Sequence, residues 1–199
     1  MAGCMTALLA ITLGFLSHSN MPNEIPLMAV GFGLRYSPDT PVPVSPDHPL
    51  YNRVLIDPIE EMPGSVRLSI ARPSTINEGL KLTLEHLHML APTSAEAKVR
   101  LTARWVSYDG GGMLFGGKNA TVTLHYRLTR IDSGAVIFDR EIITKAMADN
   151  KAGGPMPTLR AAIAVNFASI AGCLDKAAFG RAPSDCALTP QFHVTTRRR

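Results

Sequence analysis

Three cysteines, a nearly balanced charge and no catalytic signature narrow what this chain of 199 residues can do. The formal net charge is +4, but the three arginines at positions 197–199 carry three of those charges, so the rest of the chain is nearly neutral. Proteins that bind nucleic acid usually carry clustered Lys and Arg, so we expect no nucleic-acid partner. The hydrolase signature Gly-x-Ser-x-Gly does not occur. We therefore predict a protein that is not an enzyme and has no cofactor.

Neither a metal site nor a nucleotide site is predicted. His86 and His88 stand two positions apart on an expected helix, so their side chains point in different directions and cannot share a metal ion. Residues 112–119 come within one residue of a P-loop, but Asn119 replaces the hydroxyl residue that would hold magnesium. The residues that follow have the period of a strand, whereas a phosphate site needs a helix N-terminus there. We interpret this segment as a glycine-rich hairpin loop.

The bulk composition is that of a globular protein. Hydrophobic residues make up 46% of the chain and charged residues 18%. A chain of this length fits one domain and buries about 70% of its unfolded surface, so a substantial core is possible.

Residues 98–145 predict an antiparallel sheet. Apolar and polar side chains alternate there with period two, which places the apolar set on one face. Asp132, Ser133 and Gly134 have the composition of a turn between two of the strands. The apolar positions of the first two strands are Val99, Leu101, Ala103, Trp105, Val122, Leu124, Tyr126 and Leu128.

Two helices are predicted, one before and one after this sheet in the sequence. Ser74 or Thr75 would cap the first, because Thr75 and Glu78 match a capping box, and Thr158 would cap the second. Each helix has an apolar stripe at helical spacing. The stripes are Ile76, Leu80, Leu84 and Leu87 in the first helix, and Leu159, Ile163, Phe167, Ile170 and Leu174 in the second.

Further strands are expected at residues 52–56 and 66–70, which gives the order β-β-α-β-β-β-α. We predict the α+β class, with an antiparallel sheet of four to five strands and two helices packed on one face. Seven large side chains from the sheet and the helices should share one core: Trp105, Tyr126, Leu128, Phe138, Leu84, Phe167 and Ile170.

The N-terminal residues predict export. Residues 5–17 form an uncharged apolar run that suits a signal peptide and is too short to span a membrane, and small residues precede a possible cleavage before Asn20. Ala2, Gly3 and Cys4 resemble the end of a bacterial lipobox, which makes Cys4 a possible lipidation site. A buried N-terminal helix of the mature fold is the alternative.

Four segments follow from this pattern. Residues 1–19 form the signal-peptide-like segment, and residues 20–50 form a tether rich in proline, or an arm lying on the domain surface. Residues 51–180 form the α+β domain, and residues 181–199 form an irregular basic tail.

Two cysteines remain if the N-terminus is removed. Cys173 and Cys186 are separated by thirteen positions. In an oxidising compartment they could form a disulfide, which would stabilise the fold by about 3 kcal/mol on a loop-entropy estimate. Two unrelated buried thiols are the alternative.

The glycine-rich loop contains three consecutive apolar residues, Met113, Leu114 and Phe115, where a hairpin tip is usually polar. They could fold back onto a helix. We predict instead that they form a contact surface for a partner protein or a membrane, with Lys118 adding attraction to anionic headgroups.

The sequence ATVTLHYRLTRIDSGAVIFDREI at residues 120–142, followed by LRAAIAVNFASIAGCLDK at residues 159–176, resembles small bacterial envelope lipoproteins. The resemblance is to the lipopolysaccharide-assembly lipoprotein and YajG-like group, and to the auxiliary lipoproteins of envelope transporters. It implies an exported protein in the periplasm or at the inner face of the outer membrane.

Two functions are compatible with this pattern. The first is a non-catalytic accessory protein that contacts a larger membrane complex. The second is a module that binds a lipid or glycan in a cleft between the helices and the sheet. A binding module needs a sizeable apolar pocket under the helices, whereas an accessory protein needs a closed core and an exposed contact surface.

Overall fold

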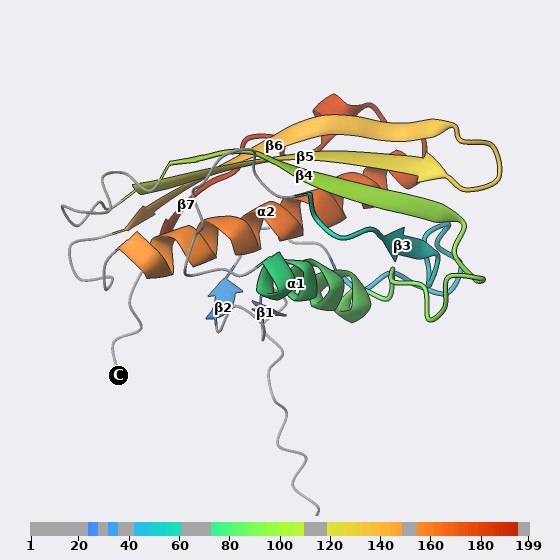
Figure 1. Ribbon diagram of the computed structural model, residues 1–199, viewed down its shortest axis with the longest axis horizontal. Coiled ribbons are helices and arrows are strands. Elements are labelled where there is room, and N and C mark those ends of the chain that lie inside the picture. Colours follow the sequence, from blue (N-terminus) through green and yellow to red (C-terminus); the bar gives the residue numbers. More distant parts are fainter. Residues whose placement is uncertain are drawn as a thin grey trace, which may run out of the picture.

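The computed structural model describes residues 24–27, 32–35, 42–60, 73–109, 119–148 and 155–194. Figure 1 shows the large sheet as one layer, with the long helices beneath it. The elements in chain order are β1 Glu24–Leu27, β2 Phe32–Arg35, β3 Val54–Ile56, α1 Pro73–His86, β4 Val99–Asp109, β5 Asn119–Arg130, β6 Val136–Ala148, α2 Pro155–Ala178, the 3₁₀ helix η2 Pro183–Asp185, and β7 Gln191–Val194.

The main sheet has five strands in the order β3-β4-β5-β6-β7, and both helices lie on one of its faces (Figure 1). The α+β class and the placement of the helices are thus confirmed. The three long central strands are antiparallel, as expected. Both edge strands run parallel to their neighbours, so the sheet is mixed. The reason is that α1 connects β3 to β4 and α2 connects β6 to β7, and a helical crossover joins parallel strands.

The alternation of the central strands is confirmed. The predicted apolar positions of β4 and β5 are all buried, and β5 pairs antiparallel with both of its neighbours, with one shift of register in each pairing. A bulge between Trp105 and Ser107 interrupts the pairing of β4, and Val106 at that point is 38% exposed. The predicted stripes of both helices are buried as well, and the seven large side chains belong to a single core.

Both helices begin at a proline, earlier than their predicted caps. Helix α1 starts at Pro73 and α2 at Pro155, so Thr75 and Thr158 lie inside the helices and the predicted caps are wrong. Proline suits the first helical position because it has no N–H group, and an N–H at that position would find no acceptor within the helix.

The end of the proline-rich segment packs on the domain as an arm, residues 42–50. Val44 and Leu50 are buried in the core. The Val44 amide donates to the Leu87 carbonyl at 3.0 Å, just beyond the end of α1, and so satisfies an acceptor that the helix leaves open. The sequence left open whether this segment is a tether or an arm on the domain surface. Residues 42–50 form an arm.

The tail after residue 180 is not irregular as predicted, because it contains η2 and β7. Leu188 and Pro190 accept hydrogen bonds from the amides of Ile143 and Lys145, which guides the tail onto the edge of β6. The predicted strand at 66–70, the signal-peptide-like segment with Cys4, and the loop with Met113, Leu114, Phe115 and Lys118 lie outside the described residues.

Helix α2 is the central element of the core. Its segment Thr158–Ala178 is apolar enough to cross a membrane by length and composition, with a mean hydropathy of 1.3. However, 72% of that apolar window is buried inside the protein, against β5 and β6. This burial identifies α2 as a core helix of the domain.

One polar residue of α2, Asn166, is fully buried against the sheet. Its side-chain oxygen accepts from the Tyr126 hydroxyl at 2.7 Å. Its amide nitrogen donates to the Ile142 carbonyl at 2.9 Å and to the Thr144 hydroxyl at 3.0 Å. These bonds fix how α2 lies over β5 and β6, since any shift of the helix would leave buried polar groups unpaired. Burial raises the pKa of Tyr126 well above its ordinary value of 10.0.

Candidate binding groove

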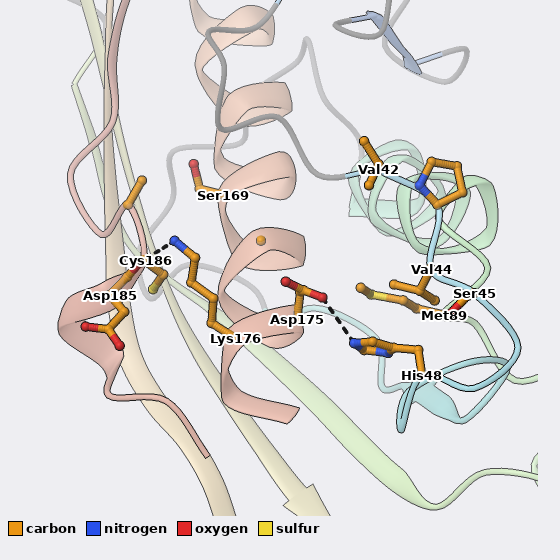
Figure 2. A pocket seen from close by; sticks show the side chains of 13 residues that line it. Val42, Val44, Ser45, His48, Met89, Ser169, Asp175, Lys176, Asp185 and Cys186 are labelled. Carbon is orange, nitrogen blue, oxygen red and sulfur yellow. Dashed lines mark hydrogen bonds and ion pairs between the residues drawn. The ribbon is translucent and has the colours of Figure 1, made fainter. Parts of the chain in front are cut away.

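A groove of about 790 Å³ lies beside α2 and is lined by this helix, the arm and the η2 segment. The residues 169, 172 and 176 that line it are three or four positions apart, so they share one face of the helix. In Figure 2 the arm stands on one side of α2, and the η2 segment stands on the other.

A disulfide fixes the η2 wall of the groove. Cys173 on α2 and Cys186 after η2 form the predicted bridge, with their Cα atoms 5.1 Å apart. This distance is within the range of ordinary disulfides. The Lys176 ammonium also donates to the Asp185 carbonyl, which holds the same segment against the helix (Figure 2).

His48 lies in the arm, the other wall of the groove, and faces α2. Its side chain is only 7% exposed, and its Nε2 atom lies 3.1 Å from Oδ1 of Asp175 (Figure 2). The Leu50 amide donates to Nδ1 at 3.1 Å, so Nδ1 is an acceptor and Nε2 carries the proton of the neutral ring. The Phe179 ring packs edge-on against the imidazole, with 5.0 Å between centroids.

The contact between His48 and Asp175 leaves hydrogen-bonding capacity unused. Nε2 of His48 lies close to Oδ1 of Asp175, but its N–H does not point along a hydrogen bond to any described residue. The Asp175 side chain is 46% exposed, and a carboxylate can accept about four hydrogen bonds. Its remaining acceptor positions are open to a ligand.

Gly172 on α2 lines the groove without a side chain. A Cβ atom there would meet nothing within 4 Å, so packing within the protein does not require glycine at this position. Glycine inside a helix costs about 1 kcal/mol relative to alanine. Gly172 is half-buried, and the missing side chain leaves open space beside the helix backbone at this point of the groove.

The groove contains serine, histidine and aspartate, but they do not form a hydrolytic triad. A catalytic histidine uses one ring nitrogen for aspartate and the other to accept the proton of serine. Here the Leu50 amide occupies Nδ1 of His48, and Nε2 faces Asp175, so neither nitrogen is available to Ser45 or Ser169. The described residues also hold no group of three or more side chains that could bind a metal ion. The arrangement is suited to binding.

The interface between the helices and the sheet is closed where the structure describes it. Phe167, Tyr126 and Ile142 are fully buried there. The lipid or glycan cleft that the sequence suggested at this place is therefore filled by core side chains. A second, smaller cavity of about 320 Å³ lies beside α1 and β3, where the side-chain oxygen of Asn77 accepts from the Ile59 amide at 2.6 Å.

The outer face of the sheet is a second exposed surface. No described helix covers it (Figure 1). Asp139 on β6 lies 2.6 Å from Nε2 of His125 and 3.8 Å from the Arg127 guanidinium, and Asp57 pairs with Arg100 at 3.7 Å. Exposed pairs of this kind contribute about 0–1 kcal/mol each. They make the face polar without assembling a reactive group.

The sequence predicted the two cysteines of this site but not His48, Gly172 or Asp175. The histidine lies in the arm and the aspartate on α2, far apart in the sequence, so only the fold brings them together. The one available signal was Gly172, a glycine within an otherwise strongly helix-forming segment. The remaining predicted contacts, at Met113, Leu114, Phe115 and Lys118, lie outside the described residues.

No family model matches the chain, and no curated protein matches it in sequence. Among solved structures, it is similar to a Xanthomonas campestris protein of family DUF330, with 13% identity and a TM-score of 0.49 over 73% of this chain and 96% of that one. A hypothetical protein of Chlamydia trachomatis has 10% identity and a TM-score of 0.49, over 64% and 98% of the two chains. PelC of Paraburkholderia phytofirmans, a dodecamer, has 13% identity and a TM-score of 0.44, over 72% and 95%. At these values the similarities carry no information on what the chain binds.

Proposed function

We propose that this protein is an exported, non-catalytic accessory protein of the bacterial cell envelope that contacts a larger membrane complex. The disulfide between Cys173 and Cys186 is the observation that carries the proposal. Disulfides persist in oxidising compartments such as the periplasm and are rare in the reducing cytosol. The apolar run at residues 5–17 supports the same location, because it has the length of a signal-peptide core.

The closed core favours contact with a partner over storage of a ligand inside the domain. In the described part of the chain, the side chains at the interface between α2 and the sheet are buried and belong to one core. The groove along α2 and the polar outer face of the sheet are instead open to a neighbouring molecule. These open surfaces support a function through contact with a partner.

The apolar residues Met113, Leu114 and Phe115, with Lys118 beside them, are a further part of the proposed contact surface. Their loop joins β4, which ends at Asp109, to β5, which begins at Asn119. Three large apolar side chains gain nothing from exposure to water, so we infer that a protein or lipid surface covers them in the cell.

Cross-linking in intact cells tests this function. Protein recovered from solubilised membranes after cross-linking should carry one or more specific envelope proteins, identified by mass spectrometry. The control is a strain expressing the same chain without residues 1–19, which should leave it in the cytosol and abolish the cross-links. Recovery of the full-length protein in the cytosol without envelope partners would reject the proposal.

A further inference from the structure

The groove along α2 is preorganised on both walls. The bridge from Cys173 to Cys186 fixes the η2 wall covalently. The arm is held by the bond from the Val44 amide to the Leu87 carbonyl and by the packing of buried His48 against Phe179, which places it beside Asp175 (Figure 2). A ligand that enters such a site does not have to order its walls, so less of the interaction free energy is lost on binding.

The charge of the groove differs from that of the chain. Its lining includes the carboxylates Asp175 and Asp185 and the single ammonium of Lys176, whereas the whole chain has a net charge of +4. The Lys176 ammonium is already hydrogen-bonded to the Asp185 carbonyl. His48 is neutral when its Nδ1 accepts from Leu50. Both carboxylates favour a cation, and the half-exposed Asp175 carboxylate is the one that points toward the arm (Figure 2).

Apolar side chains line the arm side of the groove, near this carboxylate. Val42 is 61% exposed, and Val44 and Met89 line the same cavity. The side chains of Lys and Arg combine an apolar stem with a cationic end, and they commonly lay the stem along apolar surface while the charge is paired. The volume of about 790 Å³ exceeds what one such side chain fills, so a segment of several residues fits.

We propose that this groove binds an extended segment of a partner protein, with a Lys or Arg side chain paired to Asp175 and the backbone of the segment passing over Gly172. The proposal rests on the accessory function proposed above, and it names the chemistry of one contact with the partner. The absence of a side chain at residue 172 permits this approach, because nothing lies within 4 Å of where its Cβ would be.

Nuclear magnetic resonance titration of the ¹⁵N-labelled, oxidised protein tests the proposal. The probe is the capped tripeptide Val-Arg-Val, and the control peptide is Val-Glu-Val. The Arg peptide should shift the amide signals of Gly172, Asp175 and Cys186, and the Glu peptide should not. Cadaverine, a free diamine, should bind at least tenfold more weakly, because it makes no backbone contacts. Equal binding of cadaverine and the Arg peptide would overturn the assignment to a peptide.

Two variants locate the binding. Asp175→Asn should lower the affinity for the Arg peptide about tenfold, as expected for the loss of a charged hydrogen-bond acceptor. Asp139→Asn is the matched control, since Asp139 also pairs with a histidine but lies on the outer face of the sheet, and it should leave the affinity unchanged. Gly172→Leu should abolish binding while the spectrum shows an intact fold, because its side chain enters open space.

Unchanged affinity in both Asp175→Asn and Gly172→Leu, or no shifts at the groove with any peptide, would overturn the proposal. Reduction of the disulfide should weaken binding by freeing the η2 wall. Failure of the titration in a protein that still cross-links to envelope proteins rejects the groove and leaves the accessory function standing. A cytosolic protein without envelope partners rejects the accessory function whatever the titration shows.

Discussion

Replacement of Asn166 by leucine should destabilise the domain strongly, although the two side chains have similar size. Asn166 makes three hydrogen bonds in a fully buried position, to Tyr126, Ile142 and Thr144. At about 1 kcal/mol net for each bond, their loss costs about 3 kcal/mol. The buried Tyr126 hydroxyl would also lose its acceptor, at about 1–3 kcal/mol. Burial of the leucine returns about 2 kcal/mol, so we expect a net loss of about 2–4 kcal/mol.

Urea unfolding with the disulfide intact measures this loss. Trp105 is the single tryptophan of the chain and is 6% exposed, so its fluorescence reports directly on the core. A double-mutant cycle adds the variant Tyr126→Phe, which removes the hydroxyl that donates a hydrogen bond to Asn166. In the double variant neither the Tyr126 hydroxyl nor the Asn166 amide remains to be left unpaired. Its loss in the free energy of unfolding should therefore be about 1–2 kcal/mol smaller than the sum of the two single losses. A loss below about 1 kcal/mol for Asn166→Leu, or strict additivity, would show that this network does not hold the helix on the sheet.

Four further outcomes are expected. Because burial raises the pKa of Tyr126 in the folded protein, the unfolded chain releases this proton first, so the unfolding free energy should fall as pH rises above about 10, by up to ~1.4 kcal/mol per pH unit. Tyr126→Phe should flatten that part of a pH series of urea midpoints, and an identical slope in both proteins would contradict the burial. Trp105→Ala should cost about 3–5 kcal/mol in the same assay, and a wild-type midpoint would show that the faces of β4 are assigned wrongly. Reduction of the disulfide should cost about 3 kcal/mol, and equal midpoints with and without reductant would refute a stabilising bridge. Leu114→Asp combined with Phe115→Asp should abolish association with membranes or the envelope complex with little change in melting temperature, and retained association would exclude this loop as a contact.

The parts of the fold that the sequence predicted are those with a local period. The alternation around Tyr126 and the stripe through Phe167 identified the faces that meet in the core, because each strand and helix repeats its burial within a few residues. The disulfide was predicted on other grounds, since Cys173 and Cys186 are the two cysteines left in an exported chain once the N-terminus is removed.

The parts that were missed depend on contacts between distant segments. Strand β7 has only four residues and forms where the tail meets the edge of β6, so its own sequence carries little signal. The two edge strands are parallel to their neighbours because α1 and α2 are the crossover connections that lead to or from them. No local pattern specifies which strands such a connection brings side by side. The groove likewise requires the arm with His48 to lie against Asp175, and a proline-rich segment gives no indication of where it docks.

The most direct test of the accessory function is the intact mass of the protein purified from envelope and cytosolic fractions of its native host. An exported protein should be found in the envelope fraction with its N-terminus processed, either by cleavage before Asn20 or by lipid on Cys4. Alkylation without reductant should leave Cys173 and Cys186 unlabelled, because the bridge protects both thiols. A full-length species in the cytosol that begins with unmodified Met1 and takes up alkylating reagent at both cysteines would contradict the proposed location and function.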